Sequence, residues 1–87
     1  MDAHKLCRMA NEIASFFDGD PDKKVAAAGV ASHLKRFWDP RMRRALVAWV
    51  DGHGGEGLEE TALAAVRTHR DELLPAAPAA GAPPGPR

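Results

Sequence analysis

Two Asp–Pro pairs constrain the fold of this chain more than any other feature. They lie at Asp20–Pro21 and at Asp39–Pro40. Proline cannot continue a helix, but it fits the first helical turn, and it pushes the preceding residue out of helical geometry. An aspartate in that preceding position can cap the helix that follows. We therefore expect a helix to end before each pair and another to begin at it, with Asp20 and Asp39 as the caps.

Between these breaks, apolar residues recur at steps of three and four, which predicts amphipathic helices. The expected helices span about 3–17, 21–38, 40–50 and 58–74, with a glycine linker at 51–57, and no segment has a strand pattern. The predicted class is all-α, a small bundle of about four short helices. The apolar stripe expected on the first helix, which Asp2 would cap, is Leu6, Met9, Ala10, Ile13, Phe16 and Phe17.

The composition changes at Pro75. Residues 75–87 contain only Ala, Pro, Gly and a final Arg, so they cannot bury a core or hold a helix. The sequence therefore predicts a helical domain over 1–74 and a disordered Pro/Ala-rich tail over 75–87.

The size of the chain predicts a marginal core. A domain of 87 residues buries only about 60% of the surface of its unfolded chain, and a single cysteine cannot close an intramolecular disulfide. We therefore expect a partner subunit to support the fold. No apolar segment is long enough to span a bilayer or to form a signal peptide, so we expect a cytoplasmic protein with no membrane contact.

Charge and aromatic residues concentrate in the segment HLKRFWDPRMRR, residues 33–44. Five basic residues face one acidic residue there, a local charge of +4, whereas residues 51–60 carry −4. Trp, Met and Arg are enriched in protein interfaces. The predicted partner-binding residues are Phe37, Trp38, Asp39, Pro40, Arg41, Met42, Arg43 and Arg44. One of the two adjacent rings is expected to pack inward while the other meets a partner.

Two other readings of this segment stay open. It could be a solvated charged face around buried rings, or the grip of a small nucleic-acid-binding module. The net charge of zero argues against nucleic acid, because such binders usually carry an overall basic footprint.

No pattern of residues predicts chemistry in this chain alone. His4 and Cys7 share a helix face, but two ligands do not make a zinc site. GHGGEG, at residues 52–57, lacks the lysine and hydroxyl of a phosphate-binding loop and instead suggests a linker that ends a helix. We therefore predict no catalytic, cofactor-binding or metal-binding residues.

The segments RMANEIASFF, FWDPRMR and GGEGL, in this order and spacing, resemble the delta subunit of cytoplasmic, molybdenum-containing, NAD-dependent formate dehydrogenase. The resemblance covers about residues 5–66. It implies a non-catalytic accessory subunit that binds the molybdenum-bearing alpha subunit and supports its assembly, cofactor insertion or stability. A transient assembly chaperone for the same enzyme is the alternative.

The resemblance also implies the composition of the complex. The alpha subunit is expected to carry bis-molybdopterin guanine dinucleotide and iron–sulfur clusters, and the beta and gamma subunits to pass electrons to FMN and NAD. The delta subunit is expected to bind none of these cofactors itself.

Overall fold

The computed structural model describes residues 2–74, which form five helices and no strand. The helices are α1 (Ala3–Phe17), α2 (Lys23–Phe37), α3 (Pro40–His53), α4 (Glu60–Thr68) and α5 (Arg70–Leu73). The all-α prediction is confirmed, with four longer helices and one short helical turn. The tail predicted over 75–87 lies outside the described residues.

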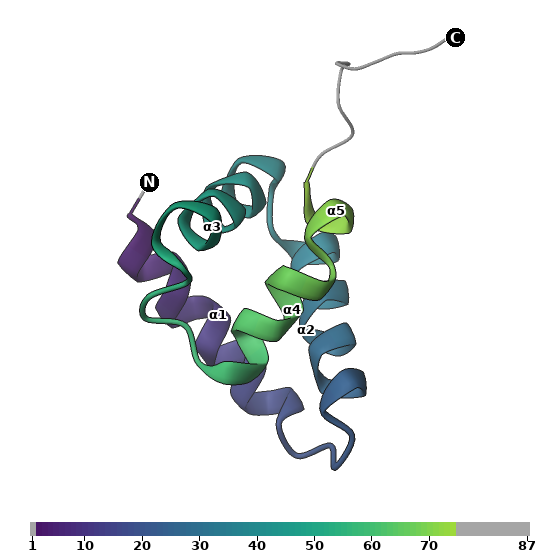
Figure 1. Cartoon of the computed structure of the whole chain (residues 1–87). Helices are drawn as coiled ribbons and strands as arrows, with labels where there is room; N and C mark the ends of the chain where they lie inside the picture. Colours follow the sequence, from purple (N-terminus) through teal and green to yellow (C-terminus); the bar gives the residue numbers. More distant parts are fainter. Residues whose placement is uncertain (1, 75–87) are drawn as a thin grey trace, which may run out of the picture.

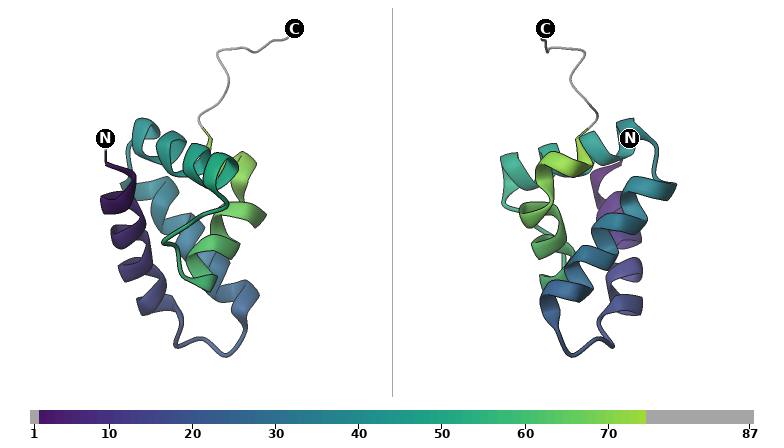
Figure 2. Two further views of the ribbon diagram at one scale, coloured as in Figure 1. Left: turned by 60° about the vertical axis from the view of Figure 1, so that its left-hand side comes forward. Right: turned by 90° about the vertical axis from the view of Figure 1, so that its right-hand side faces the viewer.

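The helices form a small bundle around an antiparallel pair. Helices α1 and α2 run in opposite directions and are joined at one end of the molecule, while α3 crosses the opposite end (Figure 1). Helix α4 packs mainly against α2, and α5 contacts both α2 and α3. Two further views show α3 and α4 on the same side of the α1–α2 pair (Figure 2).

The Asp39–Pro40 pair separates α2 from α3 as predicted. Trp38 leaves helical geometry with φ −90° and ψ 140°, so α2 ends at Phe37. The Asp39 carboxylate accepts hydrogen bonds from the backbone N–H groups of Arg41 and Met42 at 2.8 and 3.3 Å, and Pro40 occupies the first helical position. These bonds satisfy two of the donors that a helix start leaves free.

The prediction for the other Asp–Pro pair is wrong. The Asp20 carboxylate accepts from the backbone N–H of Asp22 at 2.9 Å, which closes a short turn before the helix instead of capping it. Pro21 therefore stays outside α2. The cap is Asp22, whose carboxylate accepts from Lys24 N–H at 2.9 Å. The Asp2 cap predicted for α1 is confirmed by its bond to His4 N–H.

Two more boundaries differ from the prediction. Helix α3 continues past Val50 to His53, because only from Gly54 onward does the backbone enter the left-handed region that ends the helix. The predicted fourth helix starts two residues later, at Glu60, and is interrupted at His69. The interruption starts α5, which places Leu73 in the core at 1% exposure.

Small side chains let the helices approach closely in the core. The largest fully buried side chains are Val30, Leu34, Leu46, Val47, Val66 and Leu73. Alanines fill the α1–α2–α4 contacts, and a Cβ on Gly29 would lie 2.5 Å from the ring of Phe17. Phe16, which was expected in the apolar stripe of α1, is instead 81% exposed.

The loop between α3 and α4 is held from two sides. Its glycines Gly54, Gly55 and Gly57 have positive φ, which other residues rarely adopt. The Asn11 side chain donates to the Gly57 carbonyl and accepts from Glu59 N–H, both at 2.8 Å. From the other side, the Trp49 indole donates to a loop carbonyl, that of Glu56, at 2.7 Å. These bonds confirm that the glycine segment is a structural connection.

The corner aromatics give a stability prediction. Trp38→Ala should reduce the free energy of unfolding by about 3–5 kcal/mol, because it empties a buried site. Phe37→Ala, at the exposed neighbouring position, should change it by less than about 0.5 kcal/mol. Urea unfolding followed by circular dichroism measures both. Equal destabilisation by the two substitutions would contradict the buried position of Trp38.

Candidate protein-interaction surface

The two rings of the α2–α3 corner point in opposite directions. Trp38 is 6% exposed and belongs to the core, whereas Phe37 is 68% exposed. The prediction that one of these two rings packs inward is confirmed. Trp38 therefore supports the corner from inside, and of the two rings Phe37 is the one that lies on the surface.

Basic and aromatic groups surround Phe37. The His33 ring lies one helical turn away, with its centroid 4.7 Å from that of Phe37. The Arg36 guanidinium carbon lies 5.8 Å from the Phe37 centroid, within cation–π range. The exposed ring is thus partly ordered by its neighbours on α2.

The predicted basic residues of the corner have different environments. The exposed Arg41 and Arg44 make no side-chain hydrogen bond or ion pair within residues 2–74. Arg43 is half-buried, and its Nη1 donates to the Leu73 carbonyl at 3.2 Å. Its Nε is buried without a hydrogen-bond partner among the described residues. Arg43 thus ties α3 to α5, and two of the three arginines remain free.

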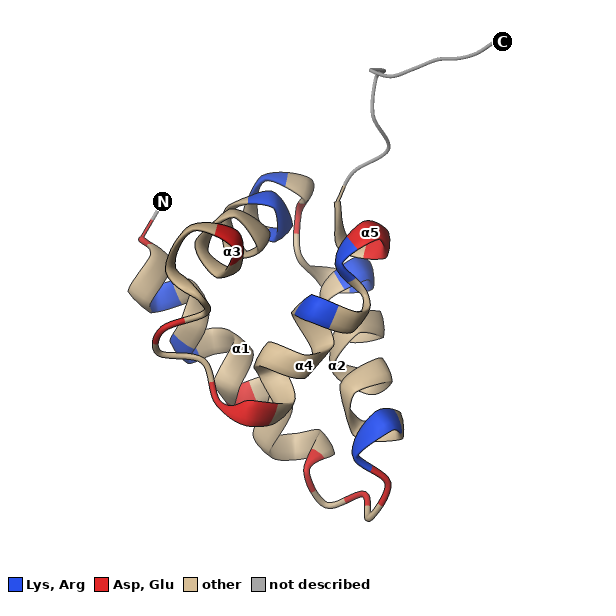
Figure 3. Cartoon of the chain, viewed as in Figure 1, with Lys and Arg blue, Asp and Glu red and all other residues tan. Residues whose placement is uncertain are grey.

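The charges are distributed along the long direction of the molecule. Basic side chains at the start of α3 lie at one end, and the connection between α1 and α2 at the opposite end is marked by acidic residues (Figure 3). Lys35, near the corner, is engaged by Glu72 at 3.5 Å. The corner therefore has fewer free cations than the sequence alone suggests.

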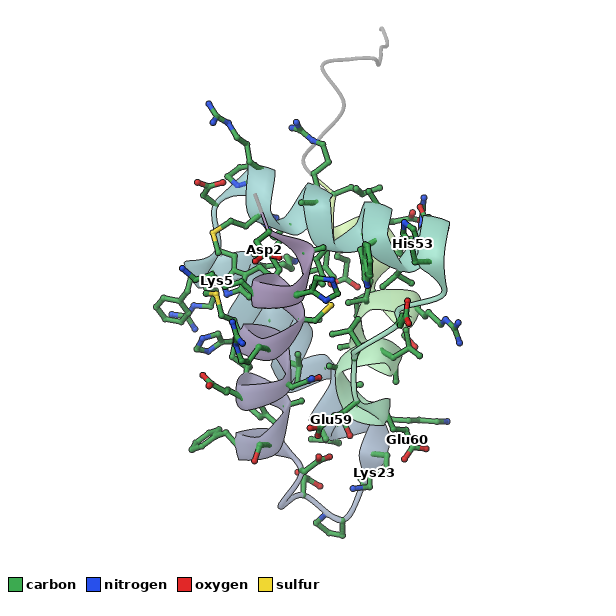
Figure 4. All side chains as sticks on the ribbon, turned by 90° about the vertical axis from the view of Figure 1, so that its left-hand side faces the viewer. Asp2, Lys5, Lys23, His53, Glu59 and Glu60 are labelled. Atoms are coloured by element: carbon green, nitrogen blue, oxygen red, sulfur yellow. The ribbon has the colours of Figure 1, made fainter. Side chains whose placement is uncertain are left out.

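A shallow hollow lies beside the corner. It has a volume of about 300 Å³ and is lined by Asp2, Lys5, Leu6, Met9, Asp39 and Met42. Asp2, which caps α1, and Lys5, in the first turn of α1, lie at the start of this helix (Figure 4). Met42 is half-buried, while Asp39 and Pro40 are exposed. The hollow joins the predicted corner to α1, which sequence reasoning had not included in the site.

A second hollow, of about 330 Å³, lies farther along α1. It is lined by Glu12, Ile13, Phe16, Phe17 and His33. Sequence reasoning placed Phe16 in the core. The sequence does indicate that one of the two adjacent rings must be exposed. Adjacent residues on a helix lie about 100° apart, so Phe16 and Phe17 cannot both face a narrow core.

The other residues that could carry out catalysis or bind a metal, a cysteine and two histidines, are held in packing contacts. Burial raises the pKa of the Cys7 thiol, whose Sγ lies 3.8 Å from the Glu56 carbonyl. The ring of His53 stacks on Trp49 at 4.1 Å, and His4 packs edge-on against the same indole. Within residues 2–74, no three or more His, Cys, Asp or Glu residues come together as a group that could hold a metal ion. None of the described helices is long and apolar enough to cross a membrane.

Three carboxylates stabilise the contacts between helices. The Thr61 hydroxyl donates to Asp18 and lowers the pKa of that carboxyl, with a further contribution from Lys23. Arg70 donates to both oxygens of Asp51, at 3.1 and 2.6 Å, and lowers its pKa.

The third carboxylate, Glu72, connects α5 to α2. Its pKa is lowered by the hydrogen bond with the His69 ring and, to a smaller extent, by Lys35. The Lys35 contact holds the short α5 against the C-terminal part of α2, next to the corner, whereas the His69 contact lies within α5 and its cap.

Together these features define a small all-helical protein with a connected apolar and basic surface over α1, α2 and the start of α3. A family model for the NADH-dependent formate dehydrogenase delta subunit, FdsD, matches residues 5–66. The chain belongs to this family, which confirms the resemblance. Membership implies a delta subunit of NAD-dependent formate dehydrogenase, and hence a multi-subunit complex. Searches of curated proteins and of solved structures found no significant match.

The lowered carboxylate pKa values predict acid sensitivity. A carboxyl whose pKa is lower in the folded state stabilises the fold above its ordinary pKa, and this contribution is lost as the pH falls. The free energy of unfolding should therefore decrease as the pH is lowered below about 4.5. Asp18→Asn and Thr61→Val should each make the free energy of unfolding depend less steeply on pH. Urea titrations at a series of pH values measure this slope. Slopes equal to that of the wild type in both variants would contradict the role of the Asp18–Thr61 bond.

Proposed function

We propose that this chain is a non-catalytic accessory subunit that binds the molybdenum-bearing alpha subunit of formate dehydrogenase and supports its assembly, cofactor insertion or stability. The observation that carries the proposal is the match to the delta-subunit family over residues 5–66. Those residues include the exposed Phe37 and the free arginines beside it. An exposed aromatic ring next to arginines is a common centre of a protein interface.

The corner would contact the partner through its exposed side chains. Phe37 supplies apolar contact, while Arg41 and Arg44 meet acidic or carbonyl groups of the alpha subunit. Trp38 and Arg43 act from inside, since the first fills the core below the corner and the second holds α5 against it. This division assigns five of the eight predicted site residues, three to contact with the partner and two to support of the corner.

The proposal assigns no redox cofactor to this chain. Bis-molybdopterin guanine dinucleotide and the iron–sulfur clusters would belong to the alpha subunit, with FMN and NAD served by the beta and gamma subunits. The contribution of the delta subunit would be to hold the alpha subunit in a form that accepts or keeps its molybdenum cofactor.

A tagged pull-down of the full chain from its native cells tests the partner. We expect to recover a large molybdenum- and iron-containing protein together with formate–NAD activity. Recovery of no large redox protein, with binding to duplex DNA that weakens steeply with salt, would favour the nucleic-acid alternative.

The stoichiometry of the active enzyme separates a subunit from a chaperone. A permanent subunit should be present at one delta per alpha in the purified enzyme, measured by quantitative mass spectrometry. A substoichiometric amount, together with tagged delta bound to alpha that lacks molybdenum, would show a transient assembly factor instead.

Charge reversal at the corner tests the contact residues. Arg41→Glu with Arg44→Glu should weaken binding to delta-depleted enzyme by at least about tenfold, as expected for charges at an interface. Arg67→Glu, an exposed position on α4, is the matched control and should change affinity little. Biolayer interferometry measures the three affinities. An equal loss in the control would show that general charge, and not the corner, governs binding.

A further inference from the structure

A row of four apolar side chains and one histidine connects the two hollows and is only partly covered by the fold. On α1 it contains Met9, Ile13 and Phe16, and on α2 it contains His33 and Phe37. We name these five residues the α1–α2 seam. Ile13, Phe16 and His33 line one hollow, Met9 lines the other, and Phe37 packs against His33. The seam is therefore continuous from the end of α1 to the α2–α3 corner.

The seam lies away from the rest of the bundle. Helix α4 packs on the other side of the α1–α2 pair, while α3 crosses the end of the pair at the corner (Figure 2). No element of residues 2–74 covers the rings of Phe16 and Phe37. These rings are 81% and 68% exposed. Exposed apolar surface of this kind usually marks a site of protein contact.

The spacing of the seam suits one further helix. Its α1 residues are separated by steps of four and three, and its α2 residues by a step of four, so each helix presents one ridge. Two such ridges on neighbouring antiparallel helices leave a groove that an amphipathic helix fills in a bundle. Residues 5–16 of α1 flank the groove, which at 1.5 Å per residue gives a length of about 17 Å, or roughly three helical turns.

The charges at the two ends of the seam differ. The exposed Lys5, Arg36 and Arg41 lie at the corner end and make no ion pair within the described residues. They outnumber the acidic Asp2 and Asp39, which lie at the same end. At the opposite end, Glu12 lines the hollow and Asp20 lies in the connection that follows α1. A helix with acidic residues at the corner end and basic residues at the Phe16 end would be complementary to both.

The composition of the candidate segments limits which of them can bind in the groove of the seam. Residues 75–87 of this chain contain five prolines and no acidic residue, so they cannot supply an amphipathic helix with an acidic end. Membership of a family of subunits favours a segment of another subunit over a second copy of this chain.

We propose that the α1–α2 seam receives one amphipathic helix of the partner subunit, about three turns long, with its acidic end at the α2–α3 corner. This inference rests on the proposed function as an accessory subunit. It adds that the bound segment of the partner is a helix, and it specifies the length and direction of that helix. Binding of this helix would cover both exposed phenylalanines and complete a bundle on the open side of the α1–α2 pair.

Photo-crosslinking identifies the occupant directly. A benzoylphenylalanine at position 16 or at position 37 of the full chain is irradiated in the assembled complex, and the crosslinked peptides are mapped by mass spectrometry. We expect both positions to mark a single segment of the partner subunit, at points about seven residues apart, because Phe37 lies level with the region of Met9 on the antiparallel α1. The mark from position 37 should lie nearer to acidic residues. Crosslinks to residues 75–87, or to a second copy of this chain, would overturn the proposal.

Matched substitutions test the energetic contribution of the seam. Phe16→Ala and Phe37→Ala should each weaken binding to delta-depleted enzyme by at least about tenfold, as expected for central aromatic residues of an interface. Val25→Ala is the control, since Val25 is 52% exposed but lines neither hollow. Its affinity should equal that of the wild type, and circular dichroism should show the same helix content in all three variants.

The affinities also separate this inference from the function on which it depends. Wild-type binding that is unaffected by both phenylalanine substitutions would overturn the seam and leave the accessory-subunit proposal in place. Failure of the wild-type chain to bind the delta-depleted enzyme would overturn both.

Discussion

The position of α4 depends on the side-chain amide of Asn11, which hydrogen-bonds to backbone groups of Gly57 and Glu59 at 2.8 Å each. One residue of α1 thereby satisfies polar groups at the end of the α3–α4 loop, immediately before α4 begins. Because α4 packs against α2 and leads into α5, this contact also determines where Leu73 enters the core and where its carbonyl meets Arg43. The glycines of the loop make the approach possible, since three of them occupy left-handed backbone conformations.

A core built largely from alanine, valine and leucine has a consequence for the surface. The close approach of α1 and α2 leaves little room between them, as the contact of Gly29 with the Phe17 ring shows. The rings of Phe17 and Trp38 take the room that the core offers, and the adjacent rings of Phe16 and Phe37 lie outside, where they form the ends of the α1–α2 seam. They provide the apolar surface that a partner can cover.

Several elements of the fold and site were predictable because a single residue type determines them locally. Proline after Asp39 excludes helix at that point, and glycine permits the loop that follows α3. Asp20 was misread because two aspartates flank Pro21, and only the hydrogen bond between them shows which one caps the helix. The interruption at His69 involves neither glycine nor proline, so it had no local signal. It is explained by the burial of Leu73, a contact between distant segments.

The sequence by itself determined the all-α class, the breaks between the first four helices, the family and the segment in which the corner lies. Only the tertiary structure decided which ring of each adjacent pair faces the core and which arginines stay free. The physical reason is that neighbouring side chains on a helix have similar local preferences but point about 100° apart. Their burial depends on what the other helices bring next to them, as the opposite positions of Phe37 and Trp38 show.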